Sequence, residues 1–137
     1  MSQENVERAR AGYAALGLAI RSGDLNAYFD EYMHPEVEWV PLEGAPDSDI
    51  SVGHKAVKGR LLAMLEVMGE PEIEAEEIID AGEKVVIAIH ISGRGRGSGI
   101  DIEANWFHVV TPRDDKVGRI EWYAARAEAL EAAGLSE

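Results

Sequence analysis

The fold is decided by residues 84–92, which read KVVIAIHIS, and residues 100–111, which read IDIEANWFHVVT. Both stretches are rich in β-branched and aromatic residues and contain no proline, a composition that favours strands. Between them, residues 93–99 read GRGRGSG, which predicts a glycine-rich hairpin connection. The two strands are therefore expected to be antiparallel neighbours in one sheet.

The sequence on either side extends this sheet. The expected elements are a turn at 112–116, a strand at 117–124, a short helix at about 125–133 and, upstream, a strand from about 72 that ends in a turn at 80–83. The upstream strand is predicted because Ile73 and Ala75 alternate with glutamates. The second half of the chain thus reads as an antiparallel meander followed by a helix.

The first half has helical spacing instead. Apolar residues recur three and four positions apart and predict helices at about 3–21, 24–33 and 54–69. Gly23 and Asp24 read as a helix stop and an N-cap. Val37 and Trp39 alternate with glutamates as in a half-buried strand, and residues 41–53 read as a long loop. This order predicts an α+β fold, with three N-terminal helices packed on a strongly curved, mostly antiparallel sheet and a short C-terminal helix.

Composition bounds the protein class. A chain of 137 residues fits one domain, expected over 1–137. The net charge of −13 argues against a nucleic-acid partner, because a phosphate backbone would be repelled. There is no cysteine for a disulfide or a thiolate metal site. No apolar run is long enough for a membrane span and no signal core is visible, so we expect a cytoplasmic protein without a membrane partner.

Strand parity places the aromatic residues. In the strand 100–111, Trp106 and His108 share a face with Ile102, Ala104 and Val110. By the same alternation Trp39 and Trp122 lie on the apolar sides of their own strands. If these sides converge, the three tryptophans surround one space that contains His108. Ligand cavities favour such aromatics with a few polar groups, although core packing alone also buries tryptophan.

The opposite face of the same strand carries Phe107 and Val109. Apolar residues on an outer sheet face are typical of an interface, so the sequence predicts a homodimer through this face.

Three stretches together resemble a known family: RSGDL at 21–25 followed by HPEVEW at 34–39, GRGRGSG at 93–99 followed by IDIE, and FHVVTPRDDKV at 107–117. They are similar to a SnoaL-like domain of the nuclear transport factor 2-like superfamily, which includes ketosteroid isomerase, limonene epoxide hydrolase and polyketide cyclases. The resemblance covers nearly the whole chain. It implies a cone-shaped α+β barrel with an apolar cavity, and frequent homodimers.

The resemblance transfers catalytic residues only in part. Trp39 stands where the isomerase has its aspartate base, and His108 stands where it has a protonated aspartate in the oxyanion hole. The isomerase's tyrosine aligns nearer Leu16, so Tyr13, one turn earlier, takes that role only if the helix is shifted. The epoxide hydrolase residues align near Lys84, Val86 and Trp122, so that catalytic set is absent.

Three roles stay open for His108: general acid/base, ligand contact without catalysis, and a hydrogen-bonded core histidine. Histidine suits proton transfer near neutral pH. The expected ligand contacts are Trp39, Trp106, Trp122, Tyr13 and Leu61. His90 has no assignable face and His34 reads as exposed. His54 reads as a solvated first-turn residue or, alternatively, as a residue at the mouth of the cavity. Histidine spacing gives no metal site, and no cofactor motif is present.

Two functions remain. One is a cofactor-independent cyclase or isomerase that acts on a hydrophobic, ring-containing small molecule through His108. The other is a non-catalytic ligand-binding or dimerisation domain.

Overall fold

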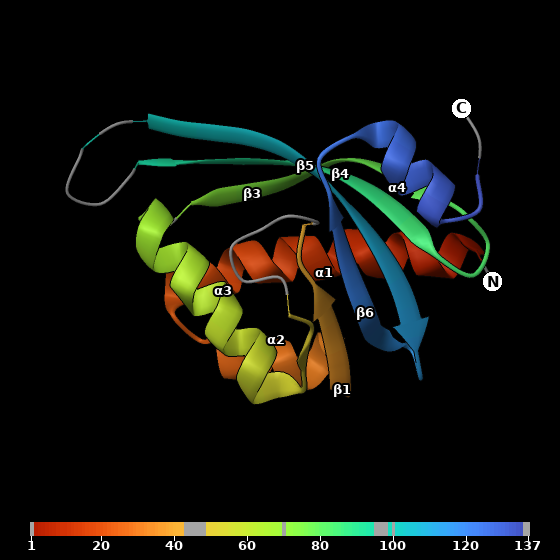
Figure 1. Ribbon diagram of the computed structural model, residues 1–137. Coiled ribbons are helices and arrows are strands. Elements are labelled where there is room, and N and C mark those ends of the chain that lie inside the picture. The colour runs from red at the N-terminus through yellow and green to blue at the C-terminus, as the bar shows by residue number, and fades with distance from the viewer. Residues whose placement is uncertain (1, 43–48, 70, 95–98, 100, 136–137) are drawn as a thin grey trace.

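The computed structural model describes residues 2–42, 49–69, 71–94, 99 and 101–135 (Figure 1). Its helices are α1 (Ser2–Ser22), α2 (Leu25–Tyr32), α3 (His54–Met68) and α4 (Arg126–Ala132). Its strands are β1 (Met33–Val40), β2 (Ser51–Val52), β3 (Glu72–Asp80), β4 (Val85–Arg94), β5 (Asp101–Arg113) and β6 (Lys116–Tyr123). The predicted α+β class is confirmed.

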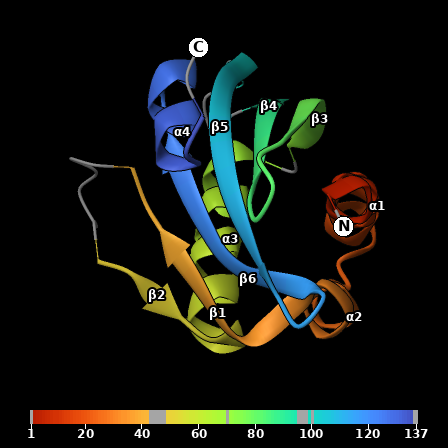
Figure 2. The same ribbon diagram turned by 90° about the vertical axis from the view of Figure 1, so that its right-hand side faces the viewer.

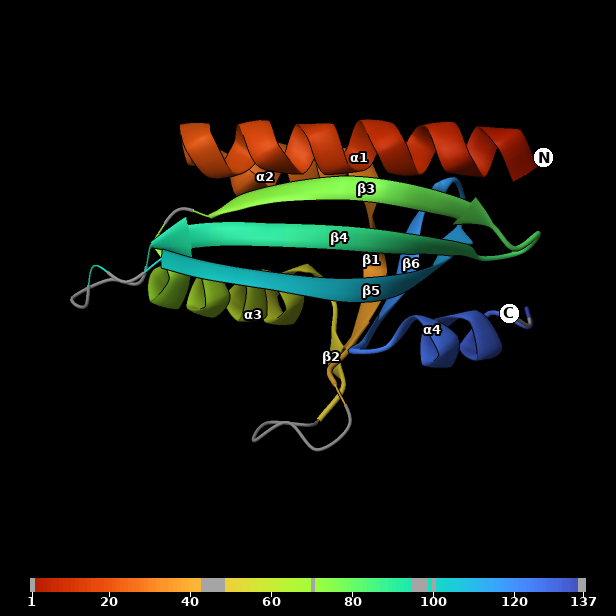
Figure 3. The same cartoon turned by 90° about the horizontal axis from the view of Figure 1, so that it is seen from above.

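The six strands of the described chain form one curved sheet in the order β2-β1-β6-β5-β4-β3. Neighbouring strands are antiparallel except β1 and β6, which are parallel. The sheet bends strongly between β5 and β1 (Figure 2) but does not close into a barrel, because β2 and β3 remain its two edges. Helix α1 runs alongside edge strand β3 (Figure 3), and α2 and α3 cover the rest of the concave face.

Local signals explain the helix boundaries. The backbone of Gly23 has φ +83°, a left-handed conformation that ends α1 at low cost. The Asp24 side chain accepts a hydrogen bond from the backbone N–H of Ala27 at 3.3 Å, so Asp24 is the predicted N-cap of α2. Gly69, with φ 66°, ends α3 in the same way as Gly23 ends α1.

Three predicted segments differ from the structure. Helix α2 ends within one residue of its predicted end, but β1 already begins at Met33 and includes Pro35, ahead of the alternating residues that predicted this strand. Part of the predicted loop 41–53 is strand β2, which pairs with Glu38 and Trp39, while residues 43–48 lie outside the described residues. The predicted turn 112–116 is reduced to Asp114 and Asp115, both with positive φ, because β5 continues through a register shift at Pro112. The tip of the predicted 93–99 connection, residues 95–98, also lies outside the described residues.

Two hydrophobic clusters lie on opposite faces of the sheet. The larger one joins the concave face to α1, α2 and α3 and includes Val37, Val57, Ile87 and Ile89. The smaller one lies on the outer face, where Ala129 and Leu130 of α4 pack on Val86 and Val109. Helix α4 therefore covers Val109 and packs near Phe107, the two residues that predicted a dimer, so the chain itself accounts for this apolar surface.

No helix among the described residues is both long and apolar enough to cross a membrane.

Candidate functional site

A cavity lies between the concave face of the sheet and helices α1, α2 and α3. Its volume is about 80 Å³, it is partly open to solvent, and its wall is almost entirely apolar. An enclosed apolar cavity of about 150 Å³ binds benzene. The space here is smaller than that, so a ring-containing ligand would extend toward the open side.

Most of the predicted site residues border this cavity. The structure places Tyr13, Trp39, Leu61, His108 and Trp122 on its wall. Trp106 of β5 is not among the wall residues and instead packs edge to face on Trp122, with ring centroids 6.3 Å apart and an interplanar angle of 67°. Its ligand contact stays a prediction.

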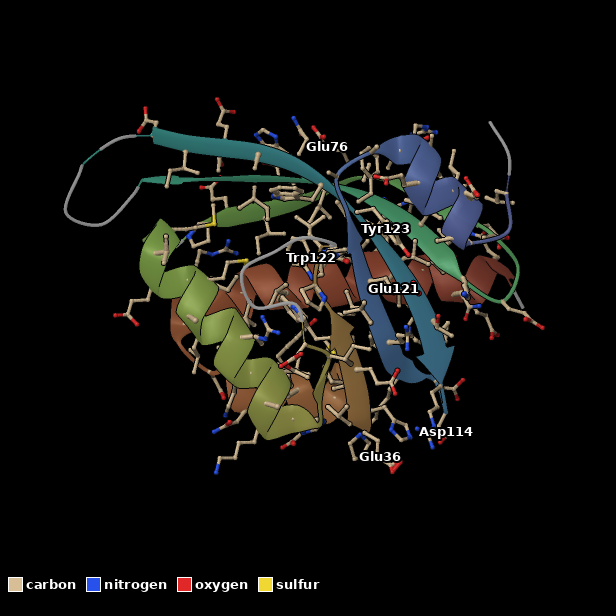
Figure 4. The ribbon with its side chains drawn as sticks, in the orientation of Figure 1. Glu36, Glu76, Asp114, Glu121, Trp122 and Tyr123 are labelled. Atoms are coloured by element: carbon tan, nitrogen blue, oxygen red, sulfur yellow. The ribbon has the colours of Figure 1, made fainter. Side chains whose placement is uncertain are left out.

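The strand register fixes the position of His108. On β5 it pairs with Ile87 of β4 and Trp122 of β6. The Trp122 ring meets the imidazole edge to face, with centroids 4.2 Å apart. In Figure 4 Trp122 lies between the sheet and the helices, whereas Glu76 points away from them. His108 is only 6% exposed, so its imidazole is enclosed by protein.

Tyr13 of α1 is hydrogen-bonded to His108. Its hydroxyl oxygen lies 2.5 Å from Nδ1 of the imidazole. Burial, with a smaller contribution from Tyr28, raises the pKa of Tyr13 well above its ordinary value, so the phenol is protonated at neutral pH. Because a phenol is the better donor and an imidazole nitrogen the better acceptor, we assign Tyr13 as the donor to Nδ1.

The imidazole is neutral in the folded protein. Burial lowers the pKa of His108 from 6.5 to about 3, because the charged form would lose its hydration inside the apolar wall. With Nδ1 accepting from Tyr13, the one imidazole proton is on Nε2. Within the described chain, His108 Nε2 and Trp122 Nε1 are buried without a hydrogen-bond partner. Such donors can hold an oxygen acceptor, but a base of this low pKa accepts a proton weakly.

The other histidines lie away from the cavity wall. His90 faces outward, where its two ring nitrogens contact Asn105 at 2.9 Å and Glu103 at 3.0 Å. His34 pairs with Asp114 at 3.2 Å, and its side chain is only 12% exposed, so the expectation of an exposed residue is wrong. Asp114 and Glu36 lie at the lower end of the molecule in Figure 4. His54 Nε2 lies 2.9 Å from the backbone oxygen of Met33, so it fastens α3 to β1 instead of remaining solvated.

Sequence reasoning missed several wall residues. Tyr28 and Tyr32 of α2 border the cavity, as do Arg8 of α1 and Lys116 of β6. Hydrophobic periodicity identifies only the apolar residues of a helix face. On α1 the wall also includes polar residues at helical spacing, and the full set is Asn5, Arg8, Ala9, Gly12, Tyr13 and Leu16. Among the described residues, no carboxylate borders the cavity and no group of three His, Asp or Glu side chains could hold a metal ion.

Comparisons with known proteins agree with this architecture. Residues 9–120 match the family model of the SnoaL-like domain. The search of curated proteins found no match. TerC, co-crystallised with polyporic acid, is 26% identical over 96% of this chain and 98% of its own, with a TM-score of 0.71.

Two further solved structures are similar. An NTF2-like protein from Burkholderia xenovorans LB400 is 26% identical over 97% of each chain, with a TM-score of 0.66. A putative SnoaL-like polyketide cyclase from Jannaschia sp. CCS1 is 16% identical over 90% of this chain and 86% of its own. Its TM-score of 0.77 shows a likeness of fold alone.

Proposed function

The chain belongs to the SnoaL-like domain family, and from that premise we propose that its cavity binds a compact ring-containing molecule through an apolar body and a carbonyl oxygen. The neutral His108 imidazole on the apolar wall carries this proposal. Tyr13 occupies Nδ1 and leaves Nε2–H as a buried donor. A buried donor without an acceptor costs about 1–3 kcal/mol. Because Nε2 has almost no accessible surface in this structure, the proposed carbonyl contact requires the His108 or Trp122 ring to turn when the ligand binds.

The shape and composition of the wall support the same ligand. Trp39 and Trp122 stack obliquely, with centroids 5.3 Å apart, and present flat apolar surfaces. Aromatic walls of this kind suit planar rings. The family resemblance and the co-crystallisation of TerC with polyporic acid support a small-molecule ligand by analogy. Ligand contacts at Tyr13, Leu61 and the two tryptophans are part of the proposal.

A matched ligand pair tests the carbonyl contact. Indanone should bind more tightly than indane, which has the same ring system without the oxygen. Replacing His108→Phe should weaken indanone binding by roughly fivefold to tenfold, the value of about one hydrogen bond, while indane changes little. Isothermal titration calorimetry gives both dissociation constants. His34→Gln, remote from the cavity, is the control. Equal affinity of wild type for indanone and indane would refute the carbonyl contact, and binding of neither would refute the ligand class.

A second candidate is a cofactor-independent isomerase or cyclase. The Tyr13–His108 hydrogen bond favours it, because a polarised Nε2–H could stabilise an enolate oxygen as it forms. The pKa of His108, lowered to about 3, argues against the imidazole itself as the base at neutral pH. No carboxylate in the described wall replaces it. This balance places non-catalytic binding first and catalysis second.

Proton exchange separates the two candidates. If the site enolises a bound ketone, the protein should accelerate exchange of the protons next to the indanone carbonyl in deuterated buffer, and His108→Phe should remove that acceleration. Proton NMR follows the exchange directly. Binding without acceleration would leave the non-catalytic function.

The homodimer and the cytoplasmic location stay proposals. With α4 over Val109, a dimer through the outer sheet face would have to use its polar part, around His90 and Glu103.

A further inference from the structure

We infer that the ligand is an anion, with its ring in the cavity and a carboxylate or similar anionic oxygen at the mouth between Arg8 and Lys116. The inference deepens the proposed function and rests on it. It concerns the part of the cavity wall formed by Arg8 of α1 and Lys116 of β6, where Arg8 also contacts Asp115 of the turn between β5 and β6.

The charge of the wall opposes the charge of the chain. Acidic residues outnumber basic ones by 26 to 13 in the sequence. Yet the described residues that border the cavity include Arg8 and Lys116 and no carboxylate. The wall itself thus carries two cations, while the nearby carboxylate of Asp115 lies outside it, so an anion in the cavity would meet positive charge first.

Arg8 and Lys116 contribute to the cavity wall through the methylene groups of their side chains. The cavity surface is almost entirely apolar although both residues border it, so their methylene groups form wall and their charged ends lie at the rim. Arg8 is 34% exposed. A charge at the edge of a low-dielectric cavity interacts more strongly than one in open solvent.

Arg8 is held weakly by its present partners, whereas Lys116 has one short hydrogen bond. Arg8 contacts the Asn5 side-chain oxygen at 3.3 Å and Asp115 at 3.6 Å, and Asp115 is 88% exposed. Lys116 donates to the backbone oxygen of Asp30 at 2.6 Å. Exposed ion pairs contribute about 0–1 kcal/mol, so a ligand carboxylate can join or replace Asp115 at little cost.

The spacing fits one ligand that reaches both ends. Arg8 precedes Tyr13 by five positions on the helix that borders the cavity, a rise of about 8 Å at ~1.5 Å per residue. Tyr13 marks the His108 end through its hydrogen bond. A one- or two-ring molecule with a carbonyl at one end and a carboxylate at the other has comparable length.

Two indanone derivatives test the inference. One carries a carboxylate on the ring carbon across from the ketone, and the other carries the uncharged carboxamide there. At low salt, wild type should bind the carboxylate about fivefold to tenfold more tightly than the carboxamide, as expected for two partly exposed charge contacts. Added sodium chloride should shrink this preference through screening. Calorimetry at neutral pH measures all the dissociation constants.

Variants of Arg8 and Lys116 test whether these two residues cause the preference for the carboxylate. Arg8→Gln combined with Lys116→Gln should abolish the preference, so that this double variant binds the carboxylate and the carboxamide with equal affinity. Arg8→Lys should keep the preference. The matched control is Arg10→Gln combined with Lys55→Gln, which removes the same charge from exposed positions that do not border the cavity.

The outcomes separate the two proposals. Equal wild-type affinity for carboxylate and carboxamide would overturn the anion inference and leave the proposed function standing. An equal loss in the control double variant would also overturn it, because net charge would then explain the preference. If neither derivative nor indanone itself binds, the proposed function fails and the inference fails with it.

Discussion

Replacing Ile87→Ala is expected to lower the free energy of unfolding by about 2–5 kcal/mol. Ile87 is 0% exposed, lies on β4 between Ile78 of β3 and His108 of β5, and does not border the cavity. The substitution therefore removes buried methyl and methylene groups and leaves a new void in packed surroundings. Chemical denaturation at neutral pH measures the change.

Ile50→Ala is the matched control for this experiment. Ile50 is 51% exposed, so the same chemical change should alter stability by no more than about 0.5 kcal/mol. Similar losses in the two variants would contradict the packing of β4 described here.

The second large effect is expected in the pH dependence of stability. The unfolded chain binds a proton at His108 near pH 6.5, but burial lowers the pKa of His108 to about 3 in the folded protein. Between these values the unfolded state binds more protons, so stability falls as the pH falls. The loss is roughly 1 kcal/mol for each pH unit below ~6.5. It ends only as the pH approaches the folded-state pKa.

Denaturation of wild type and His108→Phe from pH 7 to pH 5 checks this effect. The variant should lose less stability on acidification than wild type does. Its lost hydrogen bond from Tyr13 lowers stability equally at both pH values and cancels in the difference. If the free energy of unfolding changes equally with pH in the two proteins, the pKa of His108 is not lowered in the folded state.

His90→Gln provides a control of opposite sign. Hydrogen bonds to Asn105 and Glu103 raise the pKa of His90 above 6.5. A raised folded-state pKa stabilises the protein below the unfolded pKa, and that stability is lost as the pH rises through the folded value. Removing His90 should therefore make the protein relatively less stable in acid, whereas removing His108 should make it relatively more stable.

The inward face of the sheet was predictable because strand alternation is local. Parity in β5 and β6 was enough to put His108 and Trp122 on the same side, and the register confirms it. Parity was not enough to tell Trp106 from Trp122. Which inward residues reach the cavity depends on where the helices pack, and that is decided by contacts distant in sequence.

The partner of His108 shows the same limit. Tyr13 lies 95 residues from His108, and the resemblance placed the corresponding position nearer Leu16. Helical spacing predicted that Tyr13 and Leu16 share one face of the helix. Which of them contacts the imidazole depends on how α1 is placed against the sheet, and helical spacing does not determine that placement. Arg8 and Lys116 were not predicted to border the cavity, because charged residues are normally expected on the exposed surface.

The parallel pairing of β1 with β6 has a consequence for how the protein is made. The contact between Glu38 and Arg119 spans 81 residues, and the cavity wall includes residues from both strands. The neighbouring hairpins of β3 to β6 close short loops, whereas β1 can pair with β6 only after the 81 residues that separate Glu38 from Arg119 have been made. On the ribosome, the edge of β1 that pairs with β6 therefore remains uncovered until β6 has been made. Unpaired strand edges promote aggregation, so the nascent chain is expected to be most prone to aggregate during this interval.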